Sequence, residues 1–148
     1  MLAQTLLKRR KEYYIELGKA SKRLDIDDWL LWFSAICIEA QRNTLSYVDF
    51  IIEKDKLFSL IQNQINTRQA KVLLRLFKAG PEGFKGGLSA DNYKRISGAS
   101  TPTATRDLRG MVEKGALRKE GERKVTRYYL SVNYTPIQTV TIDDLLAL

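Results

Sequence analysis

Histidine is absent from the sequence, and Cys37 is its only cysteine. Without histidine, the chain cannot supply histidine-based acid/base catalysis, a Cys-His nucleophile or the usual zinc sites. We therefore predict no metal and no cofactor. Cys37 falls in an apolar helical pattern, which predicts a reduced core residue and a cytoplasmic protein.

Long apolar runs are also missing. No run approaches the length that spans a bilayer, and the N-terminus lacks the apolar region and cleavage site of a signal peptide. Carboxylates are dense only around Asp25, Asp27 and Asp28 and at Asp143 and Asp144, where they are typical of helix starts. These features predict that the chain does not associate with a membrane and is not an enzyme.

Positive charge dominates one half of the chain. Hydrophobic content of 44% and charged content of 28% are those of a globular protein, and the formal net charge is +8. Residues 1–66 hold ten Lys and Arg against nine Asp and Glu, whereas residues 67–148 hold fifteen against eight. A polyanion is therefore expected to bind the second half.

The stretch from Ser89 to Leu130 predicts two short helices, a turn and a β-hairpin, which is the order of a winged helix-turn-helix. In the second helix, Thr101 is the expected N-cap, Pro102 suits the first helical position and Gly115 suits the end. Four apolar residues at helical spacing predict its buried stripe: Ala104, Leu108, Met111 and Val112.

The opposite face of this helix is small and basic. A rotation of 100° per residue turns Thr103, Arg106 and Gly110 outward, with Arg109 at the flank. Small residues permit close approach to a major groove, and arginine can pair with guanine or clamp a phosphate. Asp107, next to Arg106, is predicted to pair with an arginine of the hairpin or of the first helix of the winged-helix core, which starts near Asn66, rather than to recognise cytosine.

The hairpin is predicted to pair residues 116–120 with residues 125–131, through a polar connection that opens with Gly121. It is strongly basic, which favours DNA contact, although basic hairpins also occur as solvated edges that resist aggregation. The predicted DNA-binding residues of helix and hairpin are Thr101, Thr103, Arg106, Arg109, Arg118, Arg123, Lys124 and Arg127.

The first half predicts helices. One is expected over residues 4–23, where the basic run 8–11 could be a phosphate patch but more often would be a solvated face. With Asp27 as N-cap, a long helix is predicted from Asp28 to Lys54, and Leu57, Phe58 and Ile61 predict a short third one. The long helix is apolar over a broad face, which indicates a scaffold or a homodimer interface. Its aromatic residues are expected in a core or at a partner rather than in a cofactor box.

Local signals predict both the start and the end of the next helix. Asn66 followed by Gln69 is a relative of the capping box, and the helix is expected to stop at Gly80 and Pro81. Ser89 is the expected N-cap of the following helix, and Gly98 lies in the turn after it. The tail after Leu130 is expected to be irregular, closing with one helical turn.

The predicted fold class is mainly α with a small β-hairpin, a helical N-terminal segment preceding a winged helix-turn-helix domain. The expected segments are a helical scaffold or interface over residues 1–65, the winged helix-turn-helix over residues 66–134 and a tail over residues 135–148.

Motifs along residues 5–131 resemble the C-terminal region of bacterial Fic-family (filamentation induced by cAMP) proteins. The matching pieces include Trp29-Leu30-x-Trp32-Phe33, Asn66-x-Arg68-Gln69-x-Lys71-Val72-Leu73, Thr103-Ala104-Thr105-Arg106-Asp107-Leu108 and Thr126-Arg127-Tyr128-Tyr129-Leu130. In that family an upstream domain transfers AMP from ATP to protein hydroxyls with a His-Pro-Phe-x-x-Gly-Asn-Gly-Arg loop. This chain has neither that loop nor the glutamate-bearing inhibitory motif, so the resemblance implies a detached C-terminal module without catalytic residues.

Two functions follow from these patterns. The first is a DNA-binding or regulatory module that contacts double-stranded DNA through the second helix and the hairpin. The alternative is a protein-interaction or dimerisation module, using the long helix and binding no DNA of its own.

Overall fold

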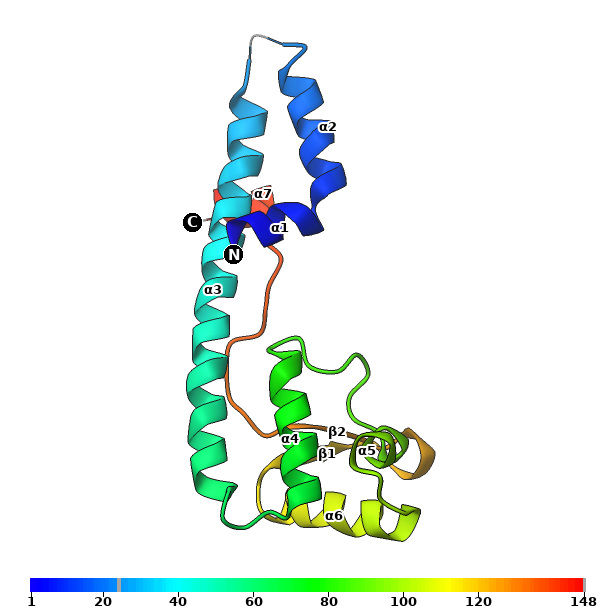
Figure 1. Cartoon of the computed structure of the whole chain (residues 1–148). Helices are drawn as coiled ribbons and strands as arrows, with labels where there is room; N and C mark the ends of the chain where they lie inside the picture. Colours follow the sequence, from blue (N-terminus) through cyan, green and yellow to red (C-terminus); the bar gives the residue numbers. More distant parts are fainter. Residues whose placement is uncertain (24, 148) are drawn as a thin grey trace. The chain divides into compact units, whose positions relative to one another are not determined.

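The computed structural model describes residues 1–23 and 25–147, which are mainly helical with a small two-stranded antiparallel sheet (Figure 1). This confirms the predicted mainly α class with a β-hairpin. The helices are α1 (Leu2–Lys8), α2 (Arg10–Ala20), α3 (Asp27–Ile61), α4 (Thr67–Ala79), α5 (Ala90–Ser97), α6 (Thr101–Glu113) and α7 (Ile142–Leu146). The strands are β1 (Leu117–Glu120) and β2 (Arg127–Leu130), with a 3-10 turn, η1 (Arg123–Val125), between them.

The chain divides into two compact units. The first unit comprises Met1–Tyr47 together with Pro136–Leu148, and the second unit comprises Val48–Thr135. The boundaries of these units differ from those of the expected segments 1–65, 66–134 and 135–148. The division falls inside α3, and the tail groups with the N-terminal helices.

In the first unit, the prediction of a single helix over residues 4–23 is wrong. The chain forms α1 and α2 instead, with a break at Arg9, where φ is −104° and ψ is 25°. Arg9 turns its side chain inward, 3.5 Å from Glu39 Oε2, and donates a hydrogen bond to the carbonyl of Val140. Glu39 in turn accepts the backbone N–H of Val140 at 2.9 Å. Arg10 instead lies over the ring of Tyr14. The run of residues 8–11 is therefore not one uniform basic face.

The long helix α3 is longer than predicted. It starts at Asp27, so Asp27 is not its N-cap, and Asp25 accepts the backbone N–H of Asp27 at 3.0 Å. The separate short helix predicted near Leu57 is the continuation of α3. Neither glycine nor proline occurs between residues 27 and 61, and Leu57 and Ile61 extend the buried face that Phe50 begins.

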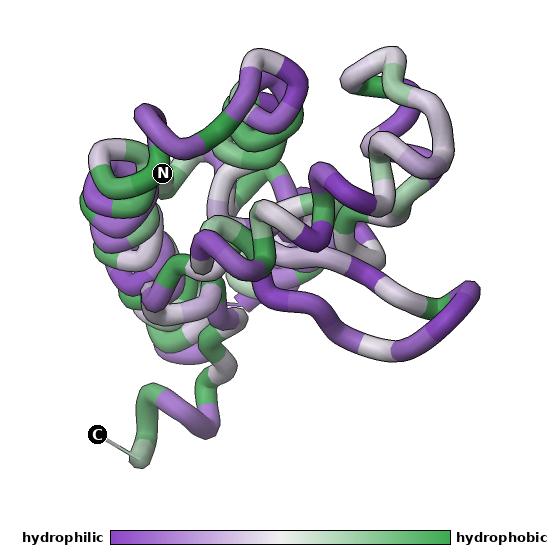
Figure 2. Tube along the Cα trace, turned by 90° about the horizontal axis from the view of Figure 1, so that it is seen from below, coloured by the Kyte–Doolittle hydropathy of each residue, from purple (hydrophilic) through white to green (hydrophobic). Residues whose placement is uncertain are grey.

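The core of the second unit is formed by α4, α5 and α6 with the end of α3, the start of β1 and the segment around Leu88. The capping box at Asn66 and Gln69 is confirmed, with both reciprocal hydrogen bonds present, and α4 ends at the predicted position before Gly80, whose φ is 75°. Purple and green residues alternate along the helical turns in Figure 2, as amphipathic helices require. The fully buried side chains of this core include Val72, Leu73, Leu88, Tyr93, Leu108, Met111 and Leu117.

The turn between α5 and α6 follows the predicted chemistry in part. Ser89 caps α5 by accepting the backbone N–H of Asn92, and Gly98 adopts the left-handed conformation at φ 74°. The N-cap of α6 is Ser100 and not Thr101, so Pro102 occupies the second helical position. Both positions tolerate a residue without a free N–H, because the first helical N–H groups have no partner within the helix.

The hairpin is shorter than predicted. Leu117 pairs with Leu130 and Glu120 pairs with Arg127, whereas Val125, predicted to begin a strand, lies in η1 and is 69% exposed. Arg123, the first residue of η1, takes a left-handed φ of 51°. Leu88 forms an isolated antiparallel bridge to Tyr128, through two hydrogen bonds of 2.9 Å.

The tail closes with the short helix α7, as predicted. A capping box at Thr141 and Asp144 starts this helix. Across residues 1–23 and 25–147, no helix combines the length and the apolar character needed to cross a bilayer.

Candidate nucleic-acid interface

The outer face of α6 carries two exposed arginines. Arg106 and Arg109 both point away from the core, as predicted. Arg109 donates to Glu113 at 2.9 Å, but Arg106 has no hydrogen bond or ion pair within the described part of the chain. Arg106 is therefore an unpaired exposed cation on the middle of the helix.

The rest of that face differs from the prediction. Thr103 is only partly exposed, and its hydroxyl is bonded to that of Ser100 at 3.0 Å. Gly110 faces α4, where an added Cβ would lie 3.5 Å from the amide nitrogen of Gln69. Thr101 is exposed and accepts from Lys94 at 3.2 Å.

The outward row of α6 follows three- and four-residue steps from Arg106. Its members, all exposed, are Pro102, Arg106, Arg109 and Glu113, and Thr105 lies beside them. Pro102 and Thr105 were missed from the sequence, although their helical spacing from Arg106 and Arg109 was a signal that could have found them.

The basic residues of the hairpin fall into two groups. Arg123 and Lys124 are exposed at the turn and make no side-chain hydrogen bond or ion pair to any described residue. Arg118 is paired with Glu120 at 3.1 Å and lies over the ring of Tyr129, and Arg127 donates to the carbonyl of Thr126 at 2.8 Å. Arg123 and Lys124 are thus free cations at the tip and Lys119 is a further exposed cation on β1, whereas Arg118 and Arg127 have local partners.

Beneath the outward row lies a polar cluster centred on Asp107, which is 4% exposed. Arg68 and the hydroxyl of Tyr93 each donate to its Oδ2 at 3.0 Å, and Asn66 donates to Oδ1 at 3.3 Å. Gln69 donates to the backbone carbonyl of Asp107 at 2.9 Å. The predicted pairing of Asp107 with an arginine of the first helix of this core is confirmed, because Arg68 belongs to α4. This Asp107 cluster joins α4, α5 and α6.

The Asp107 cluster holds its carboxylate ionised. Burial by itself raises the pKa of Asp107, but hydrogen bonds from Arg68, Tyr93 and Asn66 outweigh it, so the pKa lies below the ordinary 3.8. Burial, and then the hydrogen bond to Asp107, raises the pKa of the Tyr93 hydroxyl. Tyr93 therefore stays protonated and able to donate at any physiological pH.

A pH dependence of stability follows from the lowered pKa. A group whose pKa is lower in the folded state stabilises the fold above its unfolded pKa, and this stabilisation is lost as the pH falls through the folded pKa. We expect the free-energy difference between the native chain and Asp107→Asn to shrink below about pH 4. Urea unfolding between pH 3 and pH 6 measures it, and a difference independent of pH would contradict the assignment.

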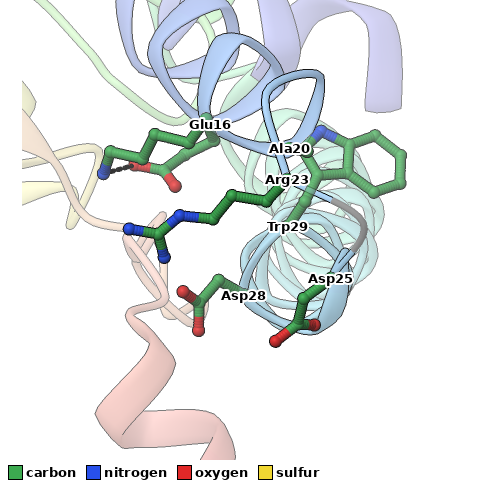
Figure 3. Close-up of a pocket in the computed structure, with 7 residues that line it drawn as sticks. Glu16, Ala20, Arg23, Asp25, Asp28 and Trp29 are labelled. Carbon is green, nitrogen blue, oxygen red and sulfur yellow. Dashed lines mark hydrogen bonds and ion pairs between the residues drawn. The ribbon is translucent and has the colours of Figure 1, made fainter.

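A separate hollow of about 290 Å³ lies in the first unit between α2 and the start of α3 (Figure 3). Its rim carries Glu16, Arg23, Asp25 and Asp28, and Lys19 pairs with Glu16 at 2.7 Å. Trp29 lines one side and stacks on Phe33 with ring centroids 5.1 Å apart. Charges of both signs surround the hollow. Among the described residues, no group of His, Cys, Asp or Glu is arranged to hold a metal ion.

Comparison of the chain with protein-family models and with curated proteins finds no match. The resemblance to Fic-family proteins therefore rests on the sequence motifs alone and stays a prediction.

Proposed function

We propose that the second unit is a winged helix-turn-helix module that binds double-stranded DNA, in a chain related to the C-terminal region of Fic-family proteins. The order of α4, α5, α6 and the β1–β2 hairpin supports this proposal, as does the tight turn at Gly98. The bridge between Leu88 and Tyr128 adds a short third segment beside the hairpin, at the start of α5. These elements are those through which a winged helix presents one helix and one β-ribbon to a duplex.

The observation that carries the proposal is that two neighbouring residues of α6 point in different directions, one into the core and one to solvent. Asp107 is buried and bound by α4 and α5, whereas Arg106 is exposed and unpaired within the described chain. Because neighbouring helical residues differ by 100° about the axis, anchoring Asp107 sets the direction in which Arg106 points. The Asp107 cluster thereby aims an uncompensated guanidinium outward, where a base edge or a phosphate would receive it.

The hairpin supplies the second contact in this proposal. Arg123 and Lys124 at the tip are free to bind phosphates, which fix position on the duplex without reading sequence. Arg109 and Arg118 would have to exchange Glu113 and Glu120 for phosphate, so we assign them smaller contributions.

Replacing Arg106 with alanine should weaken binding of the full chain to a duplex about tenfold and lower the slope of log affinity against log salt by about one. Fluorescence anisotropy with a labelled duplex over a series of low salt concentrations measures both quantities. Arg75→Ala is the matched control, because Arg75 is an exposed arginine of α4 in the same unit. Equal effects of the two substitutions, or no duplex binding by the native chain at low salt, would contradict the proposal.

A protein-interaction module remains the second candidate, and one observation favours it. Helix α3 exposes several large aliphatic side chains, among them Leu45 at 63% and Ile52 at 47%. A DNA-binding role for α6 does not account for them.

A further inference from the structure

The outer face of α6 differs in chemistry between its two halves. Near the N-terminal end, Pro102 and Thr105 are exposed and uncharged, and the exposed Arg106 has no partner within the described chain. Near the C-terminal end, the guanidinium of Arg109 donates to the carboxylate of Glu113 at 2.9 Å. The N-terminal half therefore combines apolar groups with a free hydrogen-bond donor, whereas the C-terminal half is a neutralised ion pair.

These charges favour the N-terminal half as the part of α6 that lies against base edges. The carboxylate of Glu113 repels phosphates, and its pair with Arg109 leaves no net charge at that end. The N-terminal end carries the positive pole of the helix dipole, and its first turn holds no acidic residue. Pro102, Thr105 and Arg106 are therefore the outer-face residues best placed to contact bases.

The side chain of Thr105 presents its methyl group. Its hydroxyl donates to the carbonyl of Thr101 at 3.0 Å, one turn back along the same helix. Because the oxygen is held against the backbone, the γ-methyl is the group left to meet a partner. Pro102 lies three residues before Thr105, so its ring is a neighbour on the helix surface, and it has no polar side-chain atom. Together the two residues form a small apolar surface beside Arg106.

We propose that α6 selects a guanine with a thymine in the adjacent base pair. Arg106 donates to O6 and N7 of the guanine, and the apolar surface of Pro102 and Thr105 contacts the 5-methyl group of the thymine. In the major groove, paired O6 and N7 acceptors mark guanine and a methyl group marks thymine. Consecutive Cα atoms lie about 3.8 Å apart and successive base pairs about 3.4 Å apart, so adjacent residues suit adjacent base pairs. This inference rests on the proposed DNA binding and adds the bases that are recognised.

Selection of bound duplexes from a random-sequence library by the full chain is the first test. The bound pool should be enriched in a guanine with a neighbouring thymine, and Arg106→Ala should abolish the enrichment in guanine. Recovery of no duplex at low salt would contradict the proposed DNA binding itself. A bound pool without this enrichment would overturn the base assignment and leave DNA binding standing.

Deoxyuridine in place of the selected thymine removes only the 5-methyl group. The native chain should bind the substituted duplex about fourfold more weakly, because one methyl contact is lost. Thr105→Ser keeps the hydroxyl and removes the γ-methyl, so it should bind the two duplexes within about twofold of each other. Thr67→Ser is the matched control, since Thr67 is an exposed threonine at the start of α4, and it should keep the native difference. Equal affinities of the native chain for the two duplexes would overturn the thymine contact.

Substitution of the selected guanine by 7-deazaguanine removes the N7 acceptor and keeps base pairing. The native chain should bind about fivefold more weakly, because one of two hydrogen bonds from Arg106 is lost. Arg106→Ala should not distinguish the two duplexes, whereas Arg75→Ala should keep the native difference. If the native chain also fails to distinguish them while duplex binding persists, Arg106 contacts a phosphate instead, and the guanine assignment is overturned.

Discussion

Substitution of Asp107 by alanine should lower the free energy of unfolding of the second unit by roughly 3 kcal/mol. The change leaves the buried Tyr93 hydroxyl without its acceptor and removes the partner of Arg68 and Asn66. We expect a loss of stability at the lower end of the range for broken buried ion pairs, because the Arg68 side chain is 42% exposed and water can solvate it. Urea unfolding at neutral pH measures it.

The matched control is Asp91→Ala. Asp91 also pairs with a cation, Lys94 at 3.0 Å, but its side chain is 79% exposed. An exposed pair contributes little to stability, so this variant should unfold within about 0.5 kcal/mol of the native chain. If Asp107→Ala were as mild as Asp91→Ala, the Asp107 cluster would not be what holds α4, α5 and α6 together.

Gly87→Ala should destabilise the second unit by roughly 3 kcal/mol. An added Cβ would lie 2.8 Å from Cζ of Tyr129 and 3.0 Å from Cβ of Arg127, so the hairpin must move. Gly87 also has a backbone φ of +75°, which residues with a side chain rarely adopt. Its neighbour Leu88 bridges Tyr128, so the substitution should loosen the hairpin on which the tip cations are carried.

Gly86→Ala separates these two causes. Gly86 has nearly the same φ, +72°, but nothing lies within 4 Å of an added Cβ. We expect only the conformational cost, about 1 kcal/mol. Thermal or urea unfolding of both variants gives the comparison, and equal losses would show that the close approach of Gly87 to the hairpin contributes nothing.

Features that depend on a few adjacent residues were predicted correctly from the sequence. The capping box at Asn66, the end of α4 at Gly80 and the cap at Ser89 all depend on hydrogen bonds or backbone angles within one turn. The apolar stripe predicted for α6 was also correct, since Ala104, Leu108 and Met111 are fully buried and Val112 packs, partly buried, against the same core.

Features set by contacts between distant residues were not predicted. The break at Arg9 coincides with its inward contacts to Glu39 and Val140, and no local signal marks it. The outward face of α6 was assigned from apolar residues alone. Because buried Asp107 belongs to the inward face as well, the true inward direction is rotated toward it. That rotation turns Thr103 and Gly110 partly inward and brings Pro102 and Glu113 outward.

The first unit is assembled from two segments that are far apart in the sequence, which affects the order in which the units can fold. Glu39 and Arg9 bind the backbone of Val140, which is translated 101 and 131 residues after them. The second unit, Val48–Thr135, is continuous and can fold as soon as it leaves the ribosome. The first unit must wait until Pro136–Leu148 has been translated, with the large aliphatic and aromatic groups of its earlier helices unburied. Slow synthesis should therefore expose those helices to chaperones and proteases for longer than any other part of the chain.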